Sequence, residues 1–141
     1  MHFTFKHLHM KKFYLFAVLF FATIPFSGFK NAEIANNGGE VIIINHDNFA
    51  KIVKKDIVVI DFWATWCHPC LRQAPIIDEL SKEMKKVTFG KINVDKNRGL
   101  SGKFNIRSIP TLIIFKKGIE QERIIGLHDK ATLKKIIAKY I

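Results

Sequence analysis

The stretch from residue 57 to residue 70, IVVIDFWATWCHPC, decides the fold of this chain. Its first seven residues are apolar apart from Asp61, a pattern typical of a central strand that is buried on both faces. The stretch ends in Cys67-His68-Pro69-Cys70, and apolar residues at helical spacing follow as far as residue 85. The sequence therefore predicts a buried strand that leads into a helix opened by two cysteines.

Shorter apolar runs on either side of this stretch predict the remaining elements. We expect strands at 41–44, 87–94, 111–115 and 119–125, with a hairpin turn at 117–118. We expect helices from Asp47 or Asn48 to Lys54, over 67–85 with a kink at Pro75, over 97–104, and over 130–140 after Asp129 as N-cap. Strands and helices alternate first and a hairpin comes late, so the prediction is an α/β fold with a mixed sheet and helices on both sides.

The chain is strongly basic, with 23 Lys and Arg against 12 Asp and Glu and a formal charge of +11 over 141 residues. These basic residues are dispersed, and no Arg-rich tract or zinc-finger spacing accompanies them. Dispersed lysines are typical of a solvated surface. We therefore expect no nucleic-acid partner. The length of the chain predicts one folded domain, and we expect it to be a monomer.

The two cysteines of the chain are three residues apart. A structural disulfide framework would need more cysteines at wider spacing, and a zinc site usually needs four ligands, of which His68 could supply at most a third. We therefore expect no metal. A C-x-x-C pair that follows a buried strand and opens a helix is instead typical of a redox-active dithiol.

The position of the pair on the helix predicts unequal roles for its sulfurs. Cys67 falls at the helix N-terminus, where unsatisfied N–H groups and the helix dipole favour negative charge, so we expect a lowered pKa and the attacking role for it. Cys70 lies one turn further along and is expected to resolve the mixed disulfide. Pro69 has a fixed φ that suits the first turn.

The N-terminal residues predict export. Lys6, Lys11 and Lys12 precede an uncharged segment at 13–29, the pattern of a secretory signal peptide, although no clear cleavage site follows. We expect residues 1–29 to be a cleaved signal or an uncleaved membrane anchor. A buried hairpin or core helix of a cytosolic protein is the other alternative, and translation could start at Met1 or Met10. Residues 30–40 are expected to be a linker to a domain at 41–141, placed in the periplasm or on the periplasmic side of the inner membrane.

Several motifs together strongly resemble the thioredoxin family. They are VVIDFWATWCHPC at 58–70, Pro75, GKINVDKN at 90–97, SIPTLIIFKKG at 108–118 and Gly126. The resemblance covers about residues 41–141. It implies the thioredoxin fold, a central mixed five-stranded sheet flanked by four helices. It also implies a thiol:disulfide oxidoreductase that needs no cofactor beyond its own Cys67–Cys70 disulfide.

The resemblance also assigns roles to residues around the dithiol. Asp61 matches a buried acid that relays a proton to or from Cys70, and Lys91 matches a lysine that modulates this acid. Trp66 matches an aromatic residue that flanks the nucleophile, and Trp63 one packed beneath it.

A second group of matched residues implies a substrate groove. Ile109 and Pro110 match a loop opposite the cysteines in which the peptide bond is cis, so that the Ile109 backbone is open to a substrate strand. Gly126 matches a glycine that lines the same groove.

His68 is the departure from the family pattern, since thioredoxins most often have Gly there. A protonated His beside the nucleophile stabilises its thiolate, which makes the disulfide a stronger oxidant. Our hypothesis is a potential above roughly −270 mV, which is the general reference value for thioredoxin. The alternative is an exposed His with little effect.

The direction of electron flow remains open at this point. We expect an exported reductant of protein disulfides, recharged by an electron donor such as a thioredoxin reductase or a membrane thiol reductant. An exported disulfide oxidase or isomerase is the rival. A cytochrome c maturation thioredoxin is another, since WATWC is similar to those proteins, but residues 95–110 lack their insertion. A non-catalytic thioredoxin-fold binding module is the alternative outside enzymes.

Overall fold

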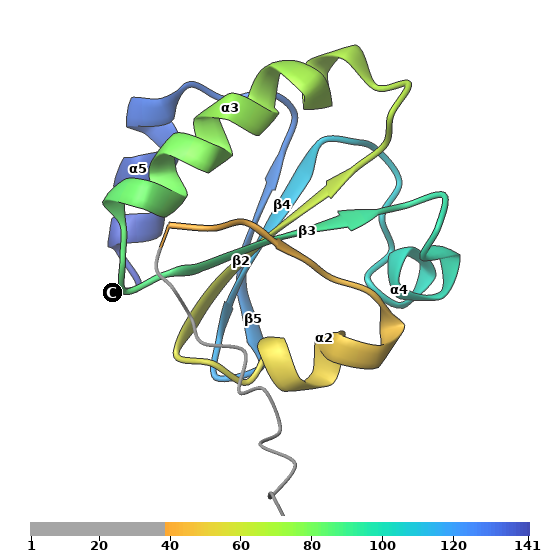
Figure 1. Cartoon of the computed structure of the whole chain (residues 1–141), viewed down its shortest axis with the longest axis horizontal. Helices are drawn as coiled ribbons and strands as arrows, with labels where there is room; N and C mark the ends of the chain where they lie inside the picture. Colours follow the sequence, from red (N-terminus) through yellow and green to blue (C-terminus); the bar gives the residue numbers. More distant parts are fainter. Residues whose placement is uncertain (1–38) are drawn as a thin grey trace, which may run out of the picture. The chain divides into compact units, whose positions relative to one another are not determined.

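The computed structural model describes residues 39–141 (Figure 1). The predicted signal or anchor at 1–29 and nearly all of the predicted linker lie outside these residues. Within the described part, no helix combines the length and the apolar character needed to cross a membrane.

A mixed sheet of five strands forms the centre of the described part. Its spatial order is β1-β3-β2-β4-β5, with β1, β3 and β2 parallel and with β4 and β5 antiparallel to their neighbours. The strands are β1 (Ile42–Ile43), β2 (Ile57–Trp63), β3 (Thr88–Asn93), β4 (Thr111–Lys116) and β5 (Ile119–Ile125). The predicted mixed five-stranded sheet is confirmed, and the buried run at 57–63 is its central strand.

Four helices within residues 39–141 cover the two faces of the sheet (Figure 1). They are α2 (His46–Ile52), α3 (His68–Glu83), α4 (Arg98–Lys103) and α5 (Lys130–Ala138). Two buried clusters show which helices cover which face of the sheet. Ile77 of α3 and Leu133 of α5 pack with Val59 on one face, whereas Phe49 of α2 and Leu100 of α4 pack with the other face. Burial of these apolar side chains is the main stabilising contribution to the fold.

The alternation along β2 directs Asp61 toward α3. Ile57 and Val59 belong to the cluster under α3 and α5, and Val58 and Ile60 belong to the opposite cluster. Successive side chains of a strand point to opposite faces, so Asp61 shares the face of Val59. The one acid in this apolar strand therefore lies beneath the helix that carries the cysteines.

Helix ends differ from the prediction by a few residues. The N-cap of α2 is Asn45 rather than Asp47 or Asn48, because its side chain accepts the N–H groups of both residues at 3.0 and 3.1 Å. Asn48 in turn accepts the Asn45 N–H, which completes a capping box. Helix α3 ends at Glu83 and contains Pro75, and α5 ends at Ala138.

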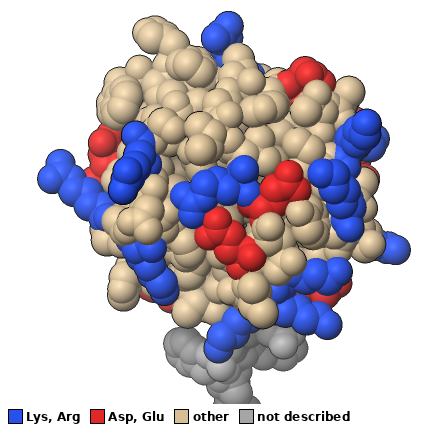
Figure 2. All heavy atoms as spheres, turned by 180° about the vertical axis from the view of Figure 1, so that it is seen from behind, with Lys and Arg blue, Asp and Glu red and all other residues tan. Residues whose placement is uncertain are grey.

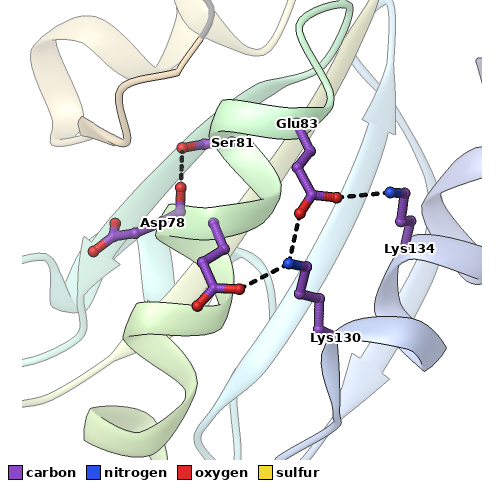
Figure 3. Close-up of polar contacts among 6 residues, drawn as sticks. Asp78, Ser81, Glu83, Lys130 and Lys134 are labelled. Carbon is purple, nitrogen blue, oxygen red and sulfur yellow. Dashed lines mark hydrogen bonds and ion pairs between the residues drawn. The ribbon is translucent and has the colours of Figure 1, made fainter.

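Ion pairs between α3 and α5 hold these two helices together (Figure 3). Glu83 contacts Lys130 at 2.5 Å and Lys134 at 2.6 Å, and Glu79 contacts Lys130 at 2.8 Å. Hydrogen bonds from Lys130 and Lys134 lower the pKa of Glu83 to about 2, and those to Glu79 and Glu83 raise the pKa of Lys130 to about 12. A single exposed ion pair adds little to stability. Here the pairs share Glu83 and Lys130 and form a network, which holds α5 in place against α3.

The remaining charges are dispersed over the surface. Figure 2 shows lysine and arginine side chains scattered over one face, with acidic side chains between some of them. The pattern on this face is that of a solvated, mixed-charge surface.

Candidate active site

The two cysteines form a disulfide at the start of α3. Their Cα atoms are 5.3 Å apart, and the side chains are 4% and 1% exposed for Cys67 and Cys70. A turn after β2 positions the cysteines at the start of α3. The turn is closed by the Cys67 N–H, which donates to the Ala64 carbonyl at 3.2 Å. The strand and helix of the central motif therefore bring the dithiol to the carboxyl end of β2.

Cys67 is the N-cap of α3. Its Sγ accepts the backbone N–H of Cys70 at 3.2 Å, in the place where a Ser or Asp oxygen usually accepts. His68 and Pro69 are the first two helical residues, and the missing N–H of Pro69 leaves no donor unsatisfied there. When the disulfide is reduced, this donor and the helix dipole both favour a thiolate at Cys67 rather than at Cys70.

Asp61 is a buried acid, 4% exposed, in the middle of the sheet. Burial raises its pKa from 3.8 to about 7, and the positive charge of Lys91 opposes this rise only in part. Its Oδ1 has no hydrogen-bond partner among the described residues. A group with a pKa near neutrality and a free acceptor atom is suited to gaining and losing a proton.

A small cavity joins Asp61 to the resolving cysteine. It has a volume of about 50 Å³ and is lined by Asp61, Cys70 and Lys91, together with Trp63 and residues of α3. This volume is sufficient for a water molecule, which needs about 10–15 Å³ of such space. Because Cys70 and Asp61 both line this space, a water molecule in it would be able to carry a proton between them.

Lys91 lies on β3, directly opposite Asp61 in the strand register. Its Nζ is 5.7 Å from the centre of the Trp63 ring, within the range of a cation–π contact. The half-buried lysine therefore lies close to both Asp61 and Trp63, the aromatic residue that the family resemblance placed beneath the dithiol.

The residues assigned to a substrate groove lie at the same end of the sheet as the dithiol, and Ile109 packs against the buried cluster that contains the two cysteines. The Ile109–Pro110 peptide bond is cis, and the Pro110 carbonyl accepts the Gly126 N–H at 2.8 Å. Gly126 has a φ of +90°, and apart from its own atoms and those of its two chain neighbours no atom lies within 4 Å of the place where a Cβ would project. A glycine satisfies this backbone conformation and leaves the space beside it open.

Exposed side chains stand next to the cysteines. Trp66 is 64% exposed, and its Nε1–H donates to Asp95 Oδ2 at 2.9 Å, which fixes the ring. His68 is exposed at the first position of α3. A large, fixed apolar surface beside a disulfide is suited to contact with another polypeptide.

Two residues near the dithiol received no role from the sequence. Asp95 lies in the quoted GKINVDKN motif, but its contact with Trp66 is non-local and has no signal in the spacing. Gln73 lies three residues after Cys70 and is fully buried. An uncharged polar residue on the inner face of an amphipathic helix is a signal that periodicity alone could have found.

No group of three or more His, Cys, Asp or Glu side chains among residues 39–141 is arranged to hold an ion. The chemistry that the arrangement supports is sulfur chemistry: a thiolate stabilised at a helix end, a second sulfur within bonding distance, and a proton acceptor below. These features define a dithiol–disulfide exchange protein.

Comparisons with known proteins agree with this class. The thioredoxin family profile matches residues 40–139. A thioredoxin of Chlamydia pneumoniae is 43% identical over 100 residues, which are 71% of this chain and 98% of the relative. Solved thioredoxins of Halobacterium salinarum (a mutant) and Plasmodium falciparum superpose with TM-scores of 0.69 and 0.67 at 31% and 36% identity. They cover 73% and 72% of this chain, and 92% and 100% of their own.

The chain belongs to the thioredoxin family. The predicted family and fold are confirmed, and the chain is a thiol–disulfide oxidoreductase.

Proposed function

We propose that this protein is an exported reductant of protein disulfides. The observation that carries the proposal is the order of segments in the sequence. The basic residues Lys6, Lys11 and Lys12 and the uncharged segment 13–29 precede a domain with a complete dithiol apparatus. The proposal places the domain in the periplasm, either released by cleavage or anchored to the inner membrane through residues 13–29.

The proposed reaction transfers two electrons from the dithiol to a substrate disulfide. The Cys67 thiolate attacks one substrate sulfur, forms a mixed disulfide and releases the other substrate sulfur as a thiolate, which takes up a proton. The Cys70 thiol gives its proton to the Asp61 carboxylate, directly or through water in the cavity. The Cys70 sulfur then attacks Cys67 Sγ, closes the Cys67–Cys70 disulfide and releases the second substrate thiolate.

The proposed substrate site is the groove between Trp66, the Ile109–Pro110 bond and Gly126. An extended substrate strand beside Ile109 would exchange backbone hydrogen bonds with it, and Trp66 would supply apolar contact. Lys91 modulates the proton affinity of Asp61 through its charge. No cofactor other than the redox disulfide takes part, and the protein acts as a monomer.

The Cys67–Cys70 disulfide is the product of this reaction, so a turnover cycle needs a donor of two electrons. A membrane thiol reductant or a thioredoxin reductase is the class of partner that the proposal requires. The donor's dithiol exchanges through the same groove and leaves as a disulfide, because reduction of the Cys67–Cys70 pair is the reverse of the steps above.

Trapping of thiols in intact cells tests both compartment and direction. Cells are treated with a membrane-permeable alkylating agent, fractionated, and the chain is resolved by mass on a non-reducing gel. We expect to find the chain in the periplasmic or membrane fraction with both cysteines alkylated. The Cys67→Ser, Cys70→Ser double variant is the control, because it shows where a chain without thiols runs on the gel. Recovery in the cytoplasmic fraction would overturn export, and a fully oxidised exported pool would overturn the reductant role.

The exposed His68 favours the oxidant direction as the second candidate. We predict that His68→Gly lowers the midpoint potential of the Cys67–Cys70 couple by about 30 mV, which corresponds to a roughly tenfold change in the equilibrium constant. The physical reason is that an imidazolium at the first position of α3 stabilises the neighbouring Cys67 thiolate, and thereby the reduced form.

A titration of the purified domain against glutathione and dithiothreitol buffers, followed by Trp fluorescence, measures this potential. His46→Gly is the matched control, because His46 is exposed on α2 and belongs to the opposite side of the sheet. Equal potentials for the wild type and His68→Gly would contradict the prediction. A wild-type potential at or below the reference value for thioredoxin of about −270 mV would do so as well.

A further inference from the structure

Gln73 is a fully buried polar side chain on the helix that carries the dithiol. It lies one turn after Cys70 on α3 and is 0% exposed. Its Oε1 accepts the backbone N–H of His128 at 3.0 Å. Its Nε2 has no hydrogen-bond partner among the described residues. A buried amide with one unpaired end is unfavourable for stability, so the bond to His128 is the interaction that distinguishes Gln73 from an apolar residue of the same size.

The bond to His128 begins a chain of contacts that leads to the groove. The His128 ring nitrogen Nδ1 lies 3.0 Å from the Gly126 carbonyl oxygen. The Gly126 N–H donates to the Pro110 carbonyl at 2.8 Å. Two hydrogen bonds and the contact of the His128 ring with Gly126 therefore connect α3, through the segment 126–128, to the proline opposite the cysteines.

This contact is separate from the ion pairs that hold α5. Glu79 contacts Lys130 further along α3. Glu83 contacts both Lys130 and Lys134 (Figure 3). Gln73 precedes them on α3 and holds the segment before α5 begins. The ion pairs fix the helix α5, and Gln73 fixes the loop that leads from β5 into it.

We propose that Gln73 is a positioning residue for substrate binding, which sets the distance between the dithiol helix and the Gly126 backbone. The inference rests on the proposed groove at Trp66, Ile109–Pro110 and Gly126. A protein substrate contacts both sides of this groove, so the position of the loop affects its binding. A small disulfide that reaches Cys67 alone does not depend on the loop.

The comparison of two substrates tests this role in the full chain. Gln73→Met keeps the length of the side chain and removes the acceptor. We expect the KM for a protein disulfide such as insulin to rise about 3- to 10-fold, the effect of one lost hydrogen bond. The kcat for insulin, and the rate with the small aromatic disulfide 5,5′-dithiobis(2-nitrobenzoate), should change less than about twofold.

Two control variants separate positioning from general destabilisation. Gln121→Met makes the same chemical change on an exposed residue of β5 and should leave all constants unchanged. Glu83→Gln weakens the α3–α5 contact without touching the loop, so it should lower the midpoint of thermal unfolding and leave the KM unchanged. Amide hydrogen exchange tests the same contact in the wild type. The His128 N–H should exchange at least about tenfold more slowly than the N–H of the exposed Leu127.

Different outcomes separate this inference from the proposed function. An unchanged KM for insulin in Gln73→Met would overturn the positioning role, and so would an equal loss of rate with both substrates. Should Gln73→Met not fold, unprotected exchange at His128 in the wild type would overturn the role by itself. Failure of the wild type to reduce either disulfide would instead overturn the proposed reductant function.

Discussion

Cys67→Ser is expected to lower the rate of insulin reduction by roughly 10³-fold or more, because a hydroxyl is not ionised at neutral pH and cannot replace the thiolate. The N-cap position of Cys67 explains the size of the effect. The Cys70 N–H that reaches Sγ at 3.2 Å and the end of the α3 dipole favour a charged sulfur, and neither has this effect on a neutral hydroxyl. Turbidity of precipitating insulin chains measures the rate.

Cys70→Ser is the matched variant, since it keeps the attacking sulfur and removes the resolving one. We expect it to accumulate a mixed disulfide with substrate, visible on a non-reducing gel and absent from Cys67→Ser. A mixed disulfide that accumulates in Cys67→Ser but not in Cys70→Ser would reverse the assigned roles. Full cellular function of the double Ser variant would favour the alternative of a non-catalytic binding module.

The fold was predictable because its signals are local. The run at 57–63 alternates between two buried clusters, and the cysteine pair follows it at the start of a helix, so strand, turn and helix could all be inferred from neighbouring residues. The cap of α2 was wrong by two or three residues because Asn45, Asp47 and Asn48 are all good caps, and only the reciprocal bond between Asn45 and Asn48 selects the first.

The site was predictable only in part, because its remaining contacts join distant segments. Periodicity placed Asp61 in a buried strand but could not show that a cavity connects it to Cys70. The bond between Gln73 and His128 spans 55 residues, and that between Trp66 and Asp95 spans 29. Pairings of this kind depend on the sheet order, which places β3 on one side of β2 and places β4 and β5 on the other side only after folding.

Asp61→Asn is expected to raise stability and to slow catalysis in the same protein. The folded chain keeps the Asp61 proton up to about pH 7, whereas the unfolded chain releases it near 3.8. Folding therefore binds a proton between these values, and the free energy of unfolding of the wild type falls as the pH rises through this window. The rise in pKa corresponds to a loss of ~4 kcal/mol in the free energy of unfolding of the wild type above pH 7. The Asn variant has no carboxyl group at this position and does not show this loss.

Urea unfolding of the oxidised proteins between pH 4 and pH 9 measures this prediction. The gap between variant and wild type should widen from pH 4 to about pH 7 and stay constant above it, with the variant the more stable. Asp78→Asn is the control, since Asp78 is exposed on α3 beside the same cavity. Parallel curves for Asp61→Asn and the wild type would show that burial does not raise the pKa of Asp61.

The rate of catalysis should fall in Asp61→Asn, although the stability of the protein rises. Without a carboxylate to accept its proton, Cys70 is a poorer nucleophile at neutral pH, so release of the mixed disulfide should slow by on the order of 10²-fold, with the first attack by Cys67 unaffected. Rapid mixing with a disulfide substrate separates the two steps, and faster release at higher pH would identify the proton transfer as the slow event. A variant that is more stable but slower would show that the buried acid is retained for its chemistry, at a cost in folding free energy.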